Sequence, residues 1–503
     1  MAGTYRKAQV ELGVFNPNPP TEAEDLLRDT SVPVVAGSFA TVTAQELRPL
    51  DYTLKECSWG FLVSTYCSCA WQALKILPNL AAILFTNMVM YSLLSYTKQP
   101  EAAAAFGMYL SYYFVFCTSV QFSLVEKFGQ ELSRGYGKKD YPYVHKVVTQ
   151  GLISMFIMFV GFNLPTLIWA DKLLILGNID PRLIPTTTKC LFLQIFVLLV
   201  QLPADMLNAF CMAQGLESEI SRVGIFGCLV SSALQYYLVM YRGYSCEAFV
   251  YGLMALGFCS LLNALFTLSK CDRRTLGVAS LSQASVGLGS YICDTVSFFL
   301  ASIGEFLGSN VTQYFIAVRH DTAAMAAFSA VRSSGALMYR TGLSLATVSR
   351  TRINILIGMG KHQTAKNFYT FYSVGTLCLA AIIGASAIVA RNQLAVLFGS
   401  QNEEVKTIFV NMVVFTGLFS CLAEIGLSPS LVGSRAVGKV RYQILMNFCM
   451  AAMWHIPCCY LMNQHKLEAN YLIISFGVNL TALSSFAFVV SLLSDWSKIE
   501  IHA

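Results

Sequence analysis

The sequence predicts an all-α integral membrane protein with 12 transmembrane helices, arranged as two repeated six-helix lobes. The first observation is composition: 55% of the 503 residues are hydrophobic and 12% are charged, against about 25% charged residues in soluble globular proteins. The second is a series of apolar runs, each long enough to cross a bilayer. The third is an internal repeat that divides the chain into halves. Together these observations exclude an ordinary soluble enzyme and a disordered chain.

The apolar runs give the order of the helices. A helix needs about 20 predominantly apolar residues to cross the hydrocarbon core of a bilayer. Runs of this length fall at 73–97, 102–126, 147–170, 184–207, 222–241, 246–268, 293–318, 322–349, 367–390, 405–427, 441–462 and 470–493. An even number of spans places both termini on the same side of the membrane.

The distribution of basic residues predicts which side that is. If both termini are cytosolic, 23 of the 34 Lys and Arg residues fall in the tails, the inner loops and their flanks, and nine fall in the outer loops. The remaining two, Arg332 and Arg340, lie inside a span. By the positive-inside rule we expect both termini in the cytosol, in a plasma membrane or an internal organelle membrane. The net charge of +6 then needs no nucleic-acid partner.

The segments outside the spans complete the domain organisation. Residues 1–56 are polar and contain no apolar core of a signal peptide, so we expect a disordered cytosolic tail. The N-lobe follows at 57–268, and we expect its first part, 57–72, to be a half-buried helix that leads into the first span. The remaining boundaries are a cytosolic linker at 269–292, the C-lobe at 293–493 and a cytosolic C-terminal tail at 494–503.

Short motifs recur at a nearly constant distance in the two halves. Ala-Ala-Phe at 104–106 recurs at 326–328, an offset of 222, and Gly-x-Gly-Lys at 135–138 recurs at 358–361, an offset of 223. Because six spans separate equivalent points, both lobes have the same orientation in the membrane. Parallel repeats of this kind are typical of transporters in which substrate binds between two lobes that rock around it.

An acid and an arginine recur as well, at an offset of 219. Asp205 and Arg222 flank the connection between the fourth and fifth helices of the N-lobe, and Glu424 and Arg441 flank the equivalent connection of the C-lobe. Their repetition suggests ion pairs that brace or gate the cytosolic face. Solvated loop charges, each worth under about 1 kcal/mol, are the alternative.

Residues 346–366 resemble the eighth-helix signature of the multidrug and toxic compound extrusion (MATE) transporters. In that signature an Arg precedes a Gly-x-Gly turn and an Ala-Lys pair opens the next helix; the residues in register here are Arg352, Gly358, Gly360, Ala365 and Lys366. Residues 435–439, followed by Asn447, resemble the family's Arg-Gly-Ser-Gly motif. The resemblance implies the fold of the MOP flippase superfamily and cation-coupled export. It also implies structural or gating roles at the cytosolic face for Arg352, Gly358, Gly360 and Arg435.

Glu305 is the residue that we expect to couple transport to an ion. It lies halfway along the span at 293–318, where an ionised side chain is costly unless it faces a cavity or a partner. The resemblance places it where the seventh-helix Glu of MATE transporters, the cation-coupling acid, falls, and Asn310 stands where eukaryotic members commonly have a second Glu. Asp294, on nearly the same helix face, forms a cavity mouth or extends into the interface. A structural role between helices is the alternative for Glu305.

Arg332 and Arg340 in the eighth span need partners, because a guanidinium stays charged in hydrocarbon. Glu305 or Asp294 on the adjacent helix could supply that partner, which would favour a structural ion pair. In the other interpretation, both arginines line the cavity and bind anionic substrates such as carboxylates.

The predicted function is secondary active transport. We expect export of organic compounds or xenobiotics by antiport with H⁺ or Na⁺, through alternating access between the two lobes. The alternatives are a lipid-linked saccharide flippase, a major-facilitator-type transporter and, from a different class, a non-transporting scaffold or a channel. The sequence contains no nucleophile with its base, metal-ligand spacing or cofactor motif, so we expect neither an enzyme nor a resident cofactor or metal. The expected partners are a small organic substrate and the bilayer, and we expect a monomer.

Overall fold

The computed structural model describes residues 59–96, 100–177, 179, 181–317, 322–398 and 403–499. Within these ranges all regular secondary structure is helical, as the sequence predicts. The expected N-terminal tail at 1–56 and the last residues of the C-terminal tail, 500–503, lie outside the described residues.

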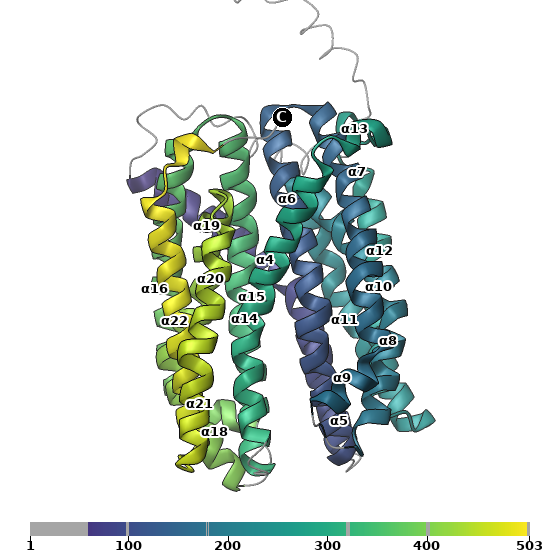
Figure 1. Ribbon diagram of the computed structural model, residues 1–503, viewed down its shortest axis with the longest axis vertical. Helices are drawn as coiled ribbons and strands as arrows, with labels where there is room; N and C mark the ends of the chain where they lie inside the picture. Colours follow the sequence, from purple (N-terminus) through teal and green to yellow (C-terminus); the bar gives the residue numbers. More distant parts are fainter. Residues whose placement is uncertain are drawn as a thin grey trace, which may run out of the picture. The chain divides into compact units, whose positions relative to one another are not determined.

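The N-terminal half of the chain forms the first of two helical bundles (Figure 1). Its helices in chain order are α4 (Trp59–Tyr96), α5 (Pro100–Tyr112), η2 (Tyr113–Thr118), α6 (Ser119–Lys138), α7 (Tyr141–Met158), η3 (Phe159–Asn163), α8 (Leu164–Ile168), α9 (Ala170–Leu176), α10 (Ile184–Ala213), α11 (Glu217–Arg242) and α12 (Glu247–Leu268). The π-helical turn η2 joins α5 to α6, so these three elements form one continuous span. We call this bundle the N-lobe.

The C-terminal half forms the second bundle, the C-lobe, beside the first (Figure 1). A linker with η4 (Arg273–Thr275) and α13 (Leu281–Ser285) leads into it. Its helices are α14 (Leu288–Ala317), α15 (Thr322–Gly358), α16 (His362–Val389), α17 (Arg391–Phe398), α18 (Glu403–Phe415), η5 (Thr416–Ser420), α19 (Cys421–Ala436), α20 (Val440–Met450), η6 (Ala451–His455), α21 (Ile456–Gln464), α22 (Ala469–Leu493) and η7 (Trp496–Lys498). The two-lobe, all-helical fold class is therefore confirmed.

Ten helical runs among the described residues are long and apolar enough to cross a membrane, from Tyr66–Leu94 to Tyr471–Leu493. Each falls on a predicted span. The largest extension is in the second span, which ends at Lys138 rather than at 126. The other two predicted spans, 322–349 and 405–427, fall in α15 and in the run from α18 to α19, which are helical but are not among the ten. The chain is thus a multi-pass membrane protein.

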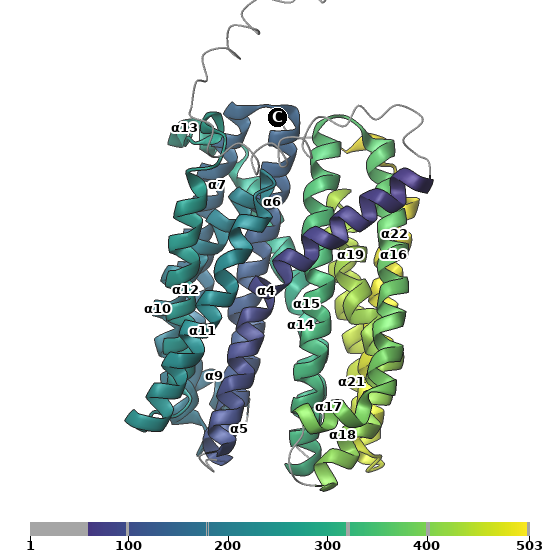
Figure 2. The ribbon, with the colours of Figure 1, turned by 180° about the vertical axis from the view of Figure 1, so that it is seen from behind.

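The first helix, α4, packs on both lobes. Its first half places Cys69, Ala73 and Ile76 in a core with residues of α15 and α16, whereas its second half contributes Met90 and Leu94 to the N-lobe core. Pro78 lies between the halves, inside the helix, where proline removes a backbone hydrogen bond and favours a kink. Figure 2 shows the first half crossing in front of α15 and α16. The segment expected to lead into the N-lobe therefore packs on the C-lobe.

The lobes meet closely at the end that carries the linker and α13, which we call the linker end (Figure 1). Here α6 and α15 approach each other at the level of their backbones. A side chain on Gly137 would meet the carbonyl oxygen of Ile355 at 2.5 Å, and one on Gly358 would collide with the carbonyl of Arg134. One glycine from each Gly-x-Gly motif, Gly137 and Gly358, therefore permits the close contact between the lobes.

Candidate functional site

A cavity lies between the lobes and is lined mainly by the C-lobe. It encloses about 940 Å³ of space, its open mouth included. Leu84, Phe114 and Phe122 line it from the N-lobe, and α14, α15, η5, α19 and α22 supply the rest of the wall. Most of the wall is apolar and aromatic. Its charged side chains are Glu305, Arg332 and Arg340, three of the residues that the sequence singles out.

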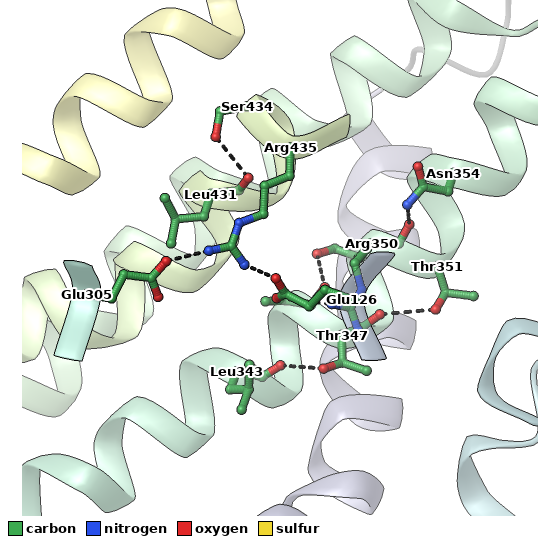
Figure 3. A network of polar contacts seen from close by, with 12 residues as sticks. Glu126, Glu305, Leu343, Thr347, Arg350, Thr351, Asn354, Leu431, Ser434 and Arg435 are labelled. Carbon is green, nitrogen blue, oxygen red and sulfur yellow. Dashed lines mark hydrogen bonds and ion pairs between the residues drawn. The ribbon is translucent and has the colours of Figure 1, made fainter. Parts of the chain in front are cut away.

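Glu305 on the cavity wall belongs to a buried network that crosses between the lobes (Figure 3). Arg435 on α19 forms ion pairs with both Glu305 on α14 and Glu126 on α6. Arg350 on α15 also pairs with Glu126, with its Nη1 atom 3.1 Å from Oε1. Gln443 on α20 donates a hydrogen bond of 2.7 Å to Glu305. Glu126 is the N-lobe member of this network, so its ion pairs join the two lobes.

The network balances its own charge. Two carboxylates, Glu126 and Glu305, meet two guanidiniums, Arg350 and Arg435, and the four side chains are between 8% and 14% exposed. Buried charges are tolerated when they are paired and hydrogen-bonded, and removing one partner leaves a costly uncompensated charge. One oxygen of the Glu305 carboxylate accepts hydrogen bonds from both Arg435 and Gln443 in this conformation.

A second polar cluster connects α6 to α14 nearer the linker end. Lys127 lies 2.9 Å from Glu131 and 2.8 Å from Asp294, measured from Nζ to the carboxylate oxygens. The hydroxyl of Tyr143 donates to the other oxygen of Glu131 at 2.6 Å. The Asp294 side chain is 47% exposed, whereas Lys127 and Glu131 are buried. Asp294 is thus part of a partly solvated inter-helix ion pair and does not line the cavity.

Further hydrogen bonds hold the linker end together. Arg134 on α6 donates to Asn354 on α15 at 3.2 Å and to the carbonyl of Ala436, the last residue of α19, at 2.7 Å. Arg352, from the MATE-like signature, donates to Gln72 on α4 at 2.8 Å. Gly360 adopts a left-handed backbone conformation with φ of +76° after the end of α15, which a glycine accommodates without strain.

Arg332 and Arg340 both line the cavity from α15. The guanidinium of Arg340 lies 5.6 Å from the ring centre of Phe122, and that of Arg332 lies 6.0 Å from the ring centre of Phe114. Arg332 also donates to Gln313. The suggested pairing with Glu305 or Asp294 is not found among the ion pairs of the described residues, because those acids are held by Arg435 and Lys127.

The other residues that the sequence singles out fall in several places. Asn310 donates to the carbonyl of Phe306 in its own helix at 2.8 Å and is not part of the cavity wall. Asp205 lies two turns before the end of α10, within electrostatic range of Arg340. Arg441 is exposed at the start of α20. The side chains of Arg222 and Glu424 lie outside the described residues, so the pairs Asp205/Arg222 and Glu424/Arg441 stay predictions.

Sequence reasoning missed Glu126, Arg350 and Gln443. The predicted spans end at 126 and 349, so Glu126 was the last residue of a span and Arg350 was assigned to an inner loop. In the structure α6 continues to Lys138 and α15 to Gly358, so both charges lie inside helices. The internal repeat contained a usable signal, because the offset of 222 makes position 126 equivalent to position 348. Glu126 and Arg350 therefore lie two residues from equivalence, on α6 and α15, which contact each other at the linker end.

The chemistry available at the site is ion pairing and proton transfer. Among the described residues no group of three or more His, Cys, Asp or Glu side chains could hold a metal ion. Among the residues that line the cavity, Glu305 is the carboxylic acid. A change in its protonation would act directly on Arg435 and, through it, on Glu126.

Comparison with known proteins identifies the fold. No family model and no curated protein matches the sequence. The eukaryotic MATE transporter AtDTX14 superposes with a TM-score of 0.74 at 18% identity, over 86% of this chain and 97% of that one. An outward-facing multidrug resistance MATE transporter of the MOP superfamily gives 0.73 at 13% identity, over 86% and 95%. A MOP superfamily transporter from Pyrococcus furiosus, described as having a binding pocket of reverse polarity, gives 0.68 at 13% identity, over 86% and 95%.

Proposed function

We propose that this chain, which has the fold of MATE transporters, is a secondary active transporter that exports organic compounds in exchange for protons. The observation that carries the proposal is the position of Arg435, which binds the cavity acid Glu305 and the N-lobe acid Glu126 at once. A protonation event in the cavity is thereby connected to the contact between the lobes. That connection is what an antiporter needs to link ion binding to a change of access.

The proposed cycle uses the inter-lobe ion pairs as a gate at the linker end. In the conformation described, Glu126 is bound to Arg350 and Arg435, and α6 is packed against α15. When Glu305 accepts a proton, Arg435 loses one of its two carboxylate partners, so that Arg350 and Arg435 share the single carboxylate of Glu126 and the network gains a net positive charge. Release of Glu126 would let the lobes separate at the linker end and approach each other at the opposite end. Switching of this kind needs a two-state element that binding biases, and the inter-lobe network supplies one.

The partners of Glu305 favour a proton over sodium as the coupling ion. A hard cation is bound by several oxygen ligands at once, whereas one oxygen of this carboxylate already accepts bonds from Arg435 and Gln443. A guanidinium in contact with the carboxylate would repel a metal cation. A proton needs one oxygen and no further ligand, so it can bind where sodium would have to displace Arg435.

We further propose that the linker end faces the cytosol, with both termini on that side. The excess of basic residues in the predicted inner loops supports this orientation. The inter-lobe linker supplies part of this excess, because Lys270, Arg273 and Arg274 lie together there. Accessibility of a C-terminal tag to an external protease, measured in sealed cells, tests the orientation. Cleavage of that tag by an external protease would overturn it.

The test of the function is flux in liposomes under an imposed proton gradient. Transport of a panel of labelled organic cations and carboxylates is measured for wild type and for Glu305→Gln. Glu403→Gln serves as the matched control, because Glu403 is 82% exposed at the start of α18. We expect gradient-driven flux in wild type and in the control, and its loss in Glu305→Gln. Flux that does not depend on the proton gradient, or gradient-driven flux that persists in Glu305→Gln, would refute proton coupling through this residue.

A further inference from the structure

Resting on the proposed function, we infer that the cavity takes an aromatic organic anion, whose carboxylate binds Arg340 and whose ring lies against the aromatic wall around Phe122. The inference starts from the charges of the cavity wall. One acid and two arginines line the cavity. The acid, Glu305, is engaged by Arg435, and the network behind it balances two carboxylates with two guanidiniums. The wall that a substrate meets is therefore positive.

Arg340 is the strongest candidate for contact with the substrate. It lines the cavity, is only 6% exposed, and forms no ion pair with any described residue. Asp205 of the N-lobe acts on it electrostatically, but the two form no ion pair. A guanidinium stays charged at this depth and presents paired N–H donors that match a carboxylate. In the absence of ligand it is stabilised by the face of Phe122, 5.6 Å from its centre.

Arg332 adds a second positive charge on the same helix. It precedes Arg340 by eight residues, about 12 Å along α15, on the side away from the linker end. Two guanidiniums at different depths of one cavity form a path of positive potential from one end of the cavity towards its interior. An anion exported from the linker end would meet Arg340 first and Arg332 next, whereas a cation would be repelled by both.

The aromatic part of the proposed ligand follows from three rings next to these arginines. Phe306 stacks with both Phe114 and Phe122, with its ring centre 6.2 and 6.0 Å from theirs and interplanar angles of 26° and 30°. The three rings line the cavity and come from both lobes. A planar ring can pack against this panel while its carboxylate reaches Arg340. Because the panel joins N-lobe and C-lobe rings, a ligand bound there would contact both lobes at once.

An anionic substrate changes the electrical balance of the exchange. If one proton enters for each monovalent anion that leaves, two positive charge equivalents move inward per cycle. Exchange of one proton for one monovalent cation would move no net charge. The inferred substrate class therefore predicts that an inside-negative potential drives export, a result that an exchanger of organic cations would not give.

The test uses three ligands that share one ring system: 2-naphthoate, its neutral amide 2-naphthamide, and the cation (2-naphthyl)trimethylammonium. Binding to the purified full-length protein is measured by equilibrium dialysis without any ion gradient. We expect naphthoate to bind at least about tenfold more tightly than the amide, a ratio of the size that a charge-assisted pair supplies. We expect the trimethylammonium ligand to bind most weakly. Tighter binding of that cation than of naphthoate would overturn the inference.

Variants then assign the anion contact. Arg340→Gln should remove the preference for naphthoate over the amide, and Arg340→Lys should retain part of it. Arg332→Gln should reduce this preference by a smaller factor. If Arg340→Gln does not fold, the smaller preference expected in Arg332→Gln still tests the inference. Arg242→Gln is the matched control, because Arg242 is an exposed arginine at the end of α11. An unchanged preference in a folded Arg340→Gln protein would refute the assignment.

The binding assay tests the substrate class and the flux assay tests proton coupling, so each proposal can be refuted without the other. Selective naphthoate binding together with gradient-independent flux would overturn proton coupling and leave the substrate class standing. Proton-driven flux of the cation without naphthoate binding would overturn the substrate class and leave the proposed antiport standing. Dependence of naphthoate export on membrane potential in liposomes is the second readout, and potential-independent export would count against the anion.

Discussion

Arg435 on α19 and Glu126 on α6 form an ion pair that joins the two lobes of the protein. The same guanidinium binds Glu305 on the wall of the inter-lobe cavity (Figure 3). One side chain therefore links the cavity to the contact that closes the linker end. The predictions below follow from this arrangement and from the packing around it.

Replacing Glu126 with Gln should weaken closure of the linker end. The change removes the charge that Arg350 and Arg435 share, and removing one member of a buried ion pair typically costs about 3–5 kcal/mol. Spin labels at the exposed positions Lys138 and Gln363, in a background without reactive cysteines, should show a longer distance in Glu126→Gln. Glu403→Gln should leave the distance unchanged. Identical distance distributions in wild type and Glu126→Gln would argue against the gate.

Adding a methyl group at the inter-lobe backbone contact should separate α6 from α15. In Gly137→Ala the new Cβ would meet the Ile355 carbonyl, and in Gly358→Ala it would collide with the Arg134 carbonyl. Overpacking of this kind costs about 1–3 kcal/mol, so both variants should unfold at a lower temperature. Gly289→Ala in α14 is the control, because no atom lies within 4 Å of the position that its Cβ would take. Equal thermal stability of all three variants would contradict the close approach.

Asp294→Asn and Lys127→Met should differ in their cost to stability, although each removes an ion pair of Lys127. Asp294→Asn removes a 47% exposed partner and leaves Lys127 bound to Glu131, so we expect a loss below about 1 kcal/mol. Lys127→Met leaves the buried Glu131 with less compensation and should cost several times more. Thermal unfolding in detergent measures both. We also expect Asp294→Asn to keep gradient-driven flux, and loss of coupling in this variant would assign Asp294 a role that its position outside the cavity wall does not support.

The hydrogen bond between Arg352 and Gln72 should hold the first half of α4 on the C-lobe. Arg352→Met removes a 2.8 Å bond from a charged donor, which is worth about 1.5–3 kcal/mol. Hydrogen exchange should then become faster in residues 66–77, while residues 81–94, which pack in the N-lobe, should keep their protection. Equal acceleration in both segments would indicate global destabilisation instead of release of this half.

Much of the architecture could be predicted from the sequence. The apolar runs locate the helices, and the recurrence of motifs at offsets of 222 and 223 indicates two lobes in the same orientation. Glu305 was expected to face a cavity or a partner, and one of the two interpretations of Arg332 and Arg340 placed them on a cavity wall; all three line the cavity. These features are accessible because hydropathy and charge inside an apolar run are local properties, read over one helix at a time.

The ends of helices and the choice of ion-pair partners were harder to predict. Hydropathy falls where charged residues begin, so the second predicted span ended at 126, although α6 continues to Lys138. Arg350 and Arg435 of the other lobe neutralise Glu126, and the buried charges that follow pair within α6 and with Asp294. The partner of Glu305 was expected on the neighbouring helix α15, yet it is Arg435, 130 residues away in the chain.

The sequence by itself determined that this protein is an all-helical, two-lobe membrane protein with an acid and two arginines in its interior. Only the tertiary structure decided which arginine neutralises Glu305, that Arg340 faces the cavity beside Phe122, and that α4 packs on both lobes. The physical reason is that the burial of a helix depends on its own apolar residues, whereas an ion pair depends on the distance between groups from separate helices. That distance is fixed when the two lobes pack, at the point where α6 meets α15 and Glu126 meets Arg435.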